Sequence, residues 1–146
     1  MSELYLIVSI AGEKVALRAA DVQSVVEIEN ITPAPRGPNW IAGLAALRSR
    51  ALTVVDSVRS LELERPEGEE LPRKAAVVEH QGHLYALLVD SFEDVVEAES
   101  DPDSIPAELS RGWQRVACGM TETELGVMLV VDLGELVAGP AEKKAA

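Results

Sequence analysis

Three aspartates that follow apolar runs are the residues best placed by type to do acid–base chemistry. Asp56, Asp90 and Asp132 each end a stretch rich in Val and Leu. Two carboxylates held within several ångströms of each other can act as a general acid and a general base. An aspartate after an apolar strand is more often the cap of a following helix or the start of a turn. Capping is therefore our main interpretation, and a carboxylate enzyme is kept as a minor hypothesis.

The other potentially reactive side chains stand alone. His80 and His83 flank Gly82, which predicts a hairpin tip, and no third Cys or His ligand is nearby. Cys118 is the single cysteine, which suits a reducing compartment, and we expect it to be a small buried residue without an activated thiol. The sequence has no phosphate-binding Gly loop, nucleophile elbow or HExxH motif. We predict no catalytic residue, no metal site and no cofactor.

Composition narrows the class of protein and of partner. The 146 residues include 13 Lys and Arg against 25 Asp and Glu, a net charge of −12. Such a charge repels phosphate backbones and anionic membranes, which argues against nucleic acid as a partner. The N-terminal apolar run stops at Gly12, too short to span a membrane, and has no basic leader. We predict a first strand there, no membrane insertion, and a length sufficient for one domain.

Short apolar runs indicate the strands that must position these residues. Runs rich in Val, Leu and Ile, most of them bounded by Gly or polar residues, predict a mostly β protein. They cover residues 4–10, 15–17, 52–55, 75–78, 84–89 and 127–131. Shifting the sequence by 70 residues places Gly12 on Gly82 and the Val-Val-Glu of residues 25–27 on that of residues 95–97. This self-similarity favours a duplicated unit, with chance similarity among apolar residues as the alternative.

The downstream part of the sequence repeats as well. A shift of 76 residues places Gly43 on Gly119 and the Val-Val-Asp that ends at Asp56 on the one that ends at Asp132. The duplication predicts two antiparallel β subdomains of similar topology within a single domain of residues 1–146. Their expected boundaries are about 15–80 and 81–130, with the N-terminal strand and a C-terminal helix closing the second. The charged, proline-containing segment Glu62–Arg73 is the expected exposed connection.

Two helices are expected. In residues 19–26 the apolar positions have helical spacing, which predicts a short amphipathic helix. Asp132 with Glu135 three residues later has the form of a capping box and predicts a C-terminal helix. Residues 138–146 are expected to fray.

Residues 31–56 form the candidate working surface. Prolines at 33, 35 and 38 predict an extended loop, and the apolar run from Trp40 to Leu47 is then broken by Arg48. Arg48 must reach water, pair with a carboxylate or meet a partner, and the residues alone leave these three choices open. Trp40 and Trp113 stand at nearly corresponding places in the two copies, and core filling is their default role.

The order and spacing of these segments resemble the CheW-like domain family of chemotaxis coupling proteins. The segments that carry the resemblance are the Gly hairpin of residues 5–17, Asp21-Val22-Gln23, Thr32-Pro33-Ala34-Pro35, Trp40-Ile41-Ala42-Gly43, Leu47-Arg48, Val54-Val55-Asp56, Leu88-Val89-Asp90 with Asp94-Val95, and Val131-Asp132.

The resemblance implies two five-stranded β-barrel subdomains packed side by side and a non-enzymatic, cytoplasmic adaptor. Members of the family bridge the cytoplasmic helical tips of methyl-accepting chemoreceptors to the histidine kinase CheA in receptor arrays. The CheA regulatory domain resembles the family and joins it through exposed barrel edges, and receptor helices lie in the apolar groove between the barrels. A divergent paralogue with another partner, or a stand-alone small-ligand module using that groove, are the alternatives.

The resemblance also indicates which residues contact partners. Leu47 and Arg48 match the Leu-Arg of the family's Asn-Leu-Arg-Gly motif, and Ala46 and Ser49 replace its Asn and Gly. The expected contact residues are Val22, Gln23, Ile41, Gly43, Leu44, Leu47 and Arg48. Because Glu124 falls opposite Arg48 in the internal repeat, we expect the first copy to be the one that binds.

Overall fold

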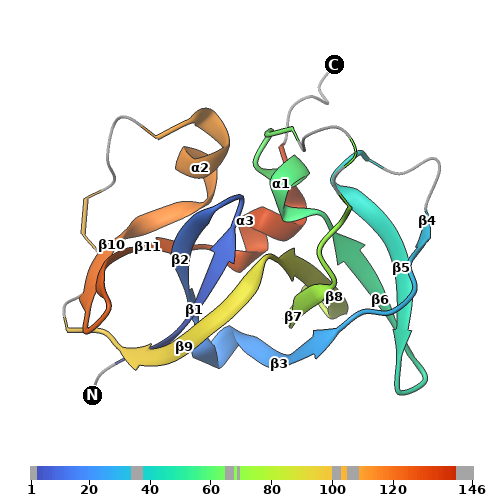
Figure 1. Ribbon diagram of the computed structural model, residues 1–146, viewed down its shortest axis with the longest axis horizontal. Coiled ribbons are helices and arrows are strands. Elements are labelled where there is room, and N and C mark those ends of the chain that lie inside the picture. Colours follow the sequence, from blue (N-terminus) through green and yellow to red (C-terminus); the bar gives the residue numbers. More distant parts are fainter. Residues whose placement is uncertain are drawn as a thin grey trace.

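The computed structural model describes residues 3–33, 38–64, 68, 70–99, 103–104 and 109–140, and Figure 1 shows its strands arranged as two sheets. The strands are β1 (Leu4–Ile10), β2 (Glu13–Arg18), β3 (Val22–Glu27), β4 (Thr32–Pro33), β5 (Ile41–Leu47), β6 (Arg50–Val55), β7 (Lys74–His80), β8 (His83–Val89), β9 (Ser91–Glu97), β10 (Ala117–Thr123) and β11 (Gly126–Val131). The helices are the short 3-10 helix η1 (Ala19–Asp21) and the α-helices α1 (Ser57–Ser60), α2 (Arg111–Val116) and α3 (Leu133–Ala138). The prediction of a mostly β protein with few short helices is confirmed.

The duplication is visible in the order of the strands. Sheet A has the order β10-β11-β2-β1-β9, and sheet B has the order β3-β7-β8-β6-β5-β4. Read from the closing hairpin, β5-β6-β8-β7-β3 follows the same path as β10-β11-β2-β1-β9, and β6–β8 and β11–β2 are parallel pairs. Each sheet therefore joins the opening hairpin of one half of the chain to strands of the other half.

The register of the hairpins supports the alignment of the two halves residue by residue. Val8 pairs with Val15 in β1–β2, and Val78 pairs with Tyr85 in β7–β8. These two pairs are separated by the 70-residue shift found in the sequence. The repeat is thus structural, because corresponding residues hold corresponding places in the two sheets.

Three details of the sheets differ from the expectation. No closed barrel forms among the described residues, although an isolated bridge between Ala98 and Thr123 links the ends of β9 and β10. The subdomains are not purely antiparallel, because docking one half's hairpin on the other half's hairpin makes a parallel pair. Sheet B also gains a sixth strand, β4, at its edge, where proline is tolerated. The subdomain boundaries remain a prediction.

The expected helix over residues 19–26 is wrong after its first turn. Helical structure ends at Asp21, and Val22–Glu27 is strand β3, which pairs with β7. The β-branched residues Val22, Val25 and Val26 fit a strand as well as a helix, and pairing with β7 decides the outcome. The corresponding segment of the second half is β9, which pairs with β1 in the same way.

Several expected segments fall partly outside the described residues. The connection Glu62–Arg73 is exposed only in part: its charged residues Glu62, Glu64, Glu70 and Arg73 and Gly68 are exposed, Leu63, Leu71 and Pro72 are half-buried, and positions 65–67 and 69 are outside. In the proline loop Thr32 and Pro33 are extended, and positions 34–37 are outside. Positions 141–146 of the tail are also outside.

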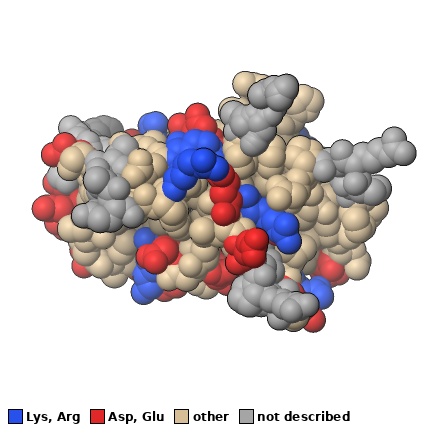
Figure 2. Space-filling model, turned by 90° about the horizontal axis from the view of Figure 1, so that it is seen from above, with Lys and Arg blue, Asp and Glu red and all other residues tan. Residues whose placement is uncertain are grey.

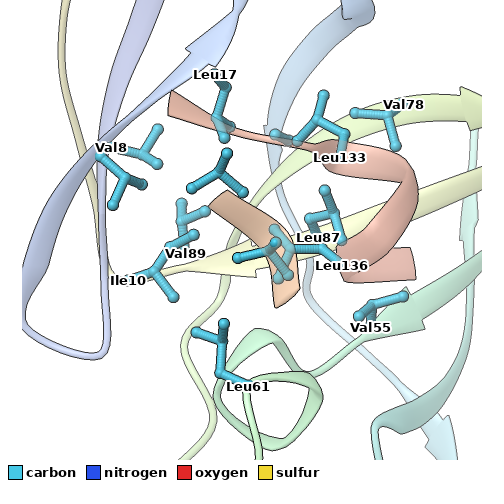
Figure 3. Packing of buried hydrophobic residues seen from close by; sticks show 14 of the residues in the cluster. Val8, Ile10, Leu17, Val55, Leu61, Val78, Leu87, Val89, Leu133 and Leu136 are labelled. Atoms are coloured by element: carbon cyan, nitrogen blue, oxygen red, sulfur yellow. The ribbon is translucent and has the colours of Figure 1, made fainter. Parts of the chain in front are cut away.

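The largest buried cluster fills the space between the two sheets. Figure 3 shows side chains of β1 and β2, such as Val8 and Leu17, facing those of β6 and β8, such as Val55 and Leu87. Leu136 of α3 is fully buried among them. Two smaller clusters lie on the other face of each sheet. The sheets are therefore joined by a continuous hydrophobic core.

Arg115 of α2 ties the three α-helices together. Its guanidinium donates hydrogen bonds to the Ser60 carbonyl oxygen at 2.9 Å, to Ser60 Oγ at 3.0 Å and to the Glu135 carbonyl oxygen at 2.8 Å. Burial lowers the pKa of Arg115, and the carboxylates of Glu135 and Glu62 oppose that effect. Figure 2, which views the molecule from above, shows positive and negative side chains lying next to each other on this face.

Candidate partner-binding surface

The hairpin between β5 and β6 carries the arginine singled out by the sequence. Leu47 pairs with Arg50, so Arg48 and Ser49 form a two-residue turn. Both have positive φ, 52° for Arg48 and 69° for Ser49, which is the type I′ conformation favoured by the twist of the strands. Residues 47–50 are called the first tip below. Arg48 thus lies at the end of a hairpin and reaches water there.

The first tip is strained in a way that similar turns of the molecule are not. The β1–β2 and β7–β8 hairpins have the same pair of positive φ values, but their second turn residues are Gly12 and Gly82. Glycine adopts this conformation without a Cβ clash, whereas serine does not. Ser49 therefore holds a position where the two related turns of this protein use glycine.

The two arginines of the first tip form no ion pair within the described part of the molecule. Arg48, Ser49 and Arg50 are all exposed. No carboxylate of the described residues lies within 4.0 Å of either arginine. In a chain with net charge −12, two adjacent exposed arginines form a local positive end. They are available to an acidic partner.

The expected contact residues of β5 divide by face. Leu44 is 49% exposed and lies on β5 three residues before the first tip, on the face opposite to the buried Ala45. Leu47 and Ile41 are partly buried and pack against the hydrophobic clusters. Gly43 is buried in a register shift at φ 152°, where a Cβ would collide with the Thr32 carbonyl of β4. Leu44 is therefore the apolar contact residue that the structure leaves open.

The two remaining expected residues lie on another strand. Val22 and Gln23 begin β3, which forms the edge of sheet B opposite to β4 and β5. Val22 packs against the core between the sheets, and Gln23 Nε2 donates to Glu79 Oε1 at 3.1 Å. The structure therefore places the seven expected residues on both edges of sheet B, and five of them belong to β5 and its turn.

The equivalent hairpin of sheet A is a feature that the sequence reasoning missed. In β10–β11, Thr123 pairs with Gly126, so Glu124 and Leu125 stand where the first tip has Arg48 and Ser49. Leu125 is 47% exposed and Val127 is 59% exposed. Residues 122–127 are called the second tip below. The sequence carried no signal for this exposure, because an exposed leucine or valine in a hairpin cannot be told from a buried one by its type.

An open hollow of about 280 Å³ lies beside the second tip. Its apolar lining comes from strands of sheet A and from the chain at α2, and Glu13 and Lys14 lie at its rim. The apolar lining residues are Val15, Leu109, Trp113, Met120, Val127 and Leu129. Trp113 is only 8% exposed, which confirms its predicted core-filling role, whereas Trp40 is partly buried and only packs against the edge of the core. By contrast, the space between the sheets is filled with side chains.

The three aspartates serve as caps and turn residues. Asp56 Oδ1 accepts hydrogen bonds from the Val58 and Arg59 backbone N–H groups at the start of α1. Asp132 Oδ1 accepts from the backbone of α3 at 2.9 and 3.4 Å, which confirms the predicted C-terminal helix and its cap. Asp90 Oδ2 accepts from the Gly12 N–H at 3.2 Å. Each carboxylate thus accepts a hydrogen bond from a backbone N–H group, local for Asp56 and Asp132 and between distant residues for Asp90.

The histidines and the cysteine show no reactive grouping. His80 and His83 form the closing pair of the β7–β8 hairpin, and His80 packs edge-on against Tyr85. Among the described residues no group of three or more His, Cys, Asp or Glu could hold a metal ion. Cys118 is exposed, so its expected burial is wrong: it is the extra residue of the register shift before Gly119 and points out of the sheet. Desolvation raises the pKa of its thiol, and the charge of Asp132 adds to that effect.

Comparison with known proteins agrees with this architecture. The crystal structure of the scaffolding protein TtCheW from Thermoanaerobacter tengcongensis matches with a TM-score of 0.78 and 24% sequence identity, covering 93% of this chain and 92% of that chain. At this identity the match shows the fold. No curated protein matches the sequence. Across the described part of the chain, no helix is long and apolar enough to cross a membrane. The model of the CheW-like domain matches residues 4–140, and the chain therefore belongs to the CheW-like domain family.

Proposed function

We propose that this protein is a non-enzymatic chemotaxis adaptor that couples the cytoplasmic helical tips of methyl-accepting receptors to the regulatory domain of CheA. It would act in the cytoplasm, held at membrane receptor arrays by its partners. The proposal is supported by membership of the CheW-like family over residues 4–140. The observation that carries it to particular residues is the exposed Arg48 at the strained first tip, which forms no ion pair with the described residues.

The first tip has the parts that a contact surface needs. Arg48 supplies an exposed charge that forms no ion pair with the described residues, and Leu44 supplies an exposed apolar side chain on the same hairpin. A well-desolvated arginine pair contributes about 1–3 kcal/mol to an interface, and covering the rest of one leucine contributes about 1 kcal/mol. Both amounts are modest, so binding needs a wider surface, which the edges of sheet B provide.

Co-sedimentation tests the proposal directly. The purified chain is mixed with receptor-containing membranes, with and without CheA, and the bound fraction is measured after centrifugation. We expect the chain to pellet with the receptors and to raise the amount of CheA that pellets. Failure of the intact protein to bind either partner would refute the proposal.

Two variants of equal charge locate the binding residues. Arg48→Glu should weaken co-sedimentation about tenfold or more, because it places a negative charge where a positive one pairs. Arg59→Glu makes the same change of charge on the exposed outer side of α1 and should leave binding unchanged. Thermal unfolding of both variants should match that of the original protein. A large loss of stability in Arg48→Glu would mean that this residue has a structural role instead.

A further inference from the structure

The open hollow beside the second tip has an apolar base made by three neighbouring strands of sheet A. Val15 of β2 pairs with Leu129 of β11, and Leu129 pairs in turn with Met120 of β10, so the three side chains lie in one row on the same face. Val15 and Leu129 are buried. Val127 lies two residues before Leu129 on that face, is more than half exposed and stands at the mouth. The hollow is therefore a surface depression with a buried apolar base.

The chain at α2 adds a wall to this depression. Trp113 of α2 and Leu109, shortly before the helix, both line the hollow. At the matching place before β5, the described residues 38–40 are not helical, and Leu44, which matches Met120, is half exposed. The second half of the chain has thus gained a wall that changes an exposed strand face into a hollow.

The mouth of the hollow carries negative charge. Glu13 lines it, and its carboxylate forms no ion pair with any residue that the structure describes. Glu122 pairs with Val127 and therefore lies on the same face, on the other side of β11. Lys14 also lines the hollow, but its ammonium group pairs with the carboxylate of Glu93 at 3.9 Å. A charged group entering the mouth is therefore favoured when it is positive.

The size of the hollow limits the kind of ligand. Its volume of about 280 Å³ lies just below the range of about 300–1,000 Å³ that is usual for ligand pockets. It admits one ring with a short chain, and it is too small for a nucleotide. A ring on the base would contact Trp113 and Met120, and a group at the end of the chain would reach Glu13 at the rim.

We propose that this hollow binds a small amphipathic cation, a molecule with one apolar ring and an ammonium group on a short chain. The apolar base would favour the ring because it removes the ring from water. The carboxylate at the rim would select the sign of the charge. A neutral alcohol of the same shape keeps the first contribution and loses the second, and an anion of similar shape meets repulsion at the mouth.

An NMR titration of the isolated chain with phenethylammonium tests this proposal. The indole N–H signals of Trp113 and Trp40 and the methyl signal of Met120 are followed up to about 20 mM ligand. We expect the Trp113 and Met120 signals to shift and to saturate with a Kd of about 0.1–1 mM. Trp40 lies against Gly139, away from the hollow, and its signal should not move. Phenethyl alcohol should bind about three- to tenfold more weakly, and phenylacetate more weakly still.

Three variants locate the site. Glu13→Gln should lower the affinity for phenethylammonium to that for the alcohol and leave the alcohol unchanged. Glu27→Gln makes the same change on the exposed strand β3 of sheet B and should alter neither affinity. Val127→Phe should fill the mouth and abolish binding of both probes. Because Val127 is exposed, thermal unfolding of this variant should match that of the original protein.

Two kinds of result would overturn the inference. A Trp113 signal that does not saturate, or that moves together with the Trp40 signal, would show that the hollow is not a binding site. Equal affinity for the cation, the alcohol and the carboxylate would show that the mouth does not select a cation. The titration uses the chain alone, so its outcome does not depend on whether the chain binds receptors or CheA.

Discussion

Replacing Ser49 by glycine should stabilise the protein. Ser49 has φ 69°, and the β1–β2 and β7–β8 turns, which have the same conformation, have glycine at the corresponding position. A non-glycine residue in this left-handed conformation destabilises the folded state by about 1–2 kcal/mol. Glycine avoids that strain, but it favours the unfolded chain by about 0.4–1 kcal/mol because the unfolded chain then has more conformational freedom. The difference is a gain of about 0.5–1 kcal/mol in the free energy of unfolding for Ser49→Gly. In a domain of this size that corresponds to an increase of about 2–3 °C in Tm.

Chemical denaturation and thermal unfolding by circular dichroism would measure the change, and the matched control is the reverse exchange in a related hairpin. Gly82 has φ 85° in the β7–β8 turn, and a Cβ added there meets no other atom within 4 Å. Gly82→Ser should therefore lower the free energy of unfolding by about the amount that Ser49→Gly raises it. If Ser49→Gly lowers stability while Gly82→Ser also lowers it, the first tip is not strained and the reasoning is refuted.

Three other predictions follow from contacts inside the fold. Asp56→Ala removes the cap of α1 and should lower the free energy of unfolding by about 1 kcal/mol in urea denaturation, whereas Asp56→Asn should change it by less because asparagine also caps. Arg115→Met removes the donor to the Ser60 carbonyl and one of the two donors to the Glu135 carbonyl and should cost about 2–4 kcal/mol, with Arg111→Met as a mild control because its side chain is exposed. Because desolvation and Asp132 raise the thiol pKa, alkylation of Cys118 should reach half its maximal rate at a higher pH than in a free cysteine peptide, and Asp132→Asn should move that pH downward.

Repetition made most of the architecture predictable from the sequence. Gly43 and Gly119 mark the same register shift in β5–β6 and β10–β11, and their sequence alignment was enough to match the two halves. What the repeat could not reveal is which half pairs with which. The types of the paired residues, such as Thr53 and Tyr85 in the parallel β6–β8 pair, suit a strand equally well beside any neighbouring strand. The sequence analysis placed the N-terminal strand in the second subdomain, but the parallel pairing of β2 with β11 and of β8 with β6 became visible only in the structure.

Two local errors have the same physical origin. Val22 was assigned to a helix because its spacing from Val25 and Val26 fits 3.6 residues per turn, yet three β-branched residues beside a free edge of β7 form a strand instead. Cys118 was assigned to the core because it aligns with Ala42, but as the extra residue of the register shift before Gly119 it is exposed, whereas Ala42 at the matching shift packs against a core cluster. In both cases a partner strand, which the local sequence does not contain, sets the orientation of the side chain.

Only the charged part of the candidate surface was predicted, because a sequence shows which side chains are charged but not which apolar side chains are exposed. Arg48 was found from its type alone, since a guanidinium between apolar runs must leave the core. Leu125 and Val127 gave no such signal, because an exposed apolar residue in a hairpin has the same letter as a buried one. Only the solvent exposure shows that apolar side chains also gather at the second tip.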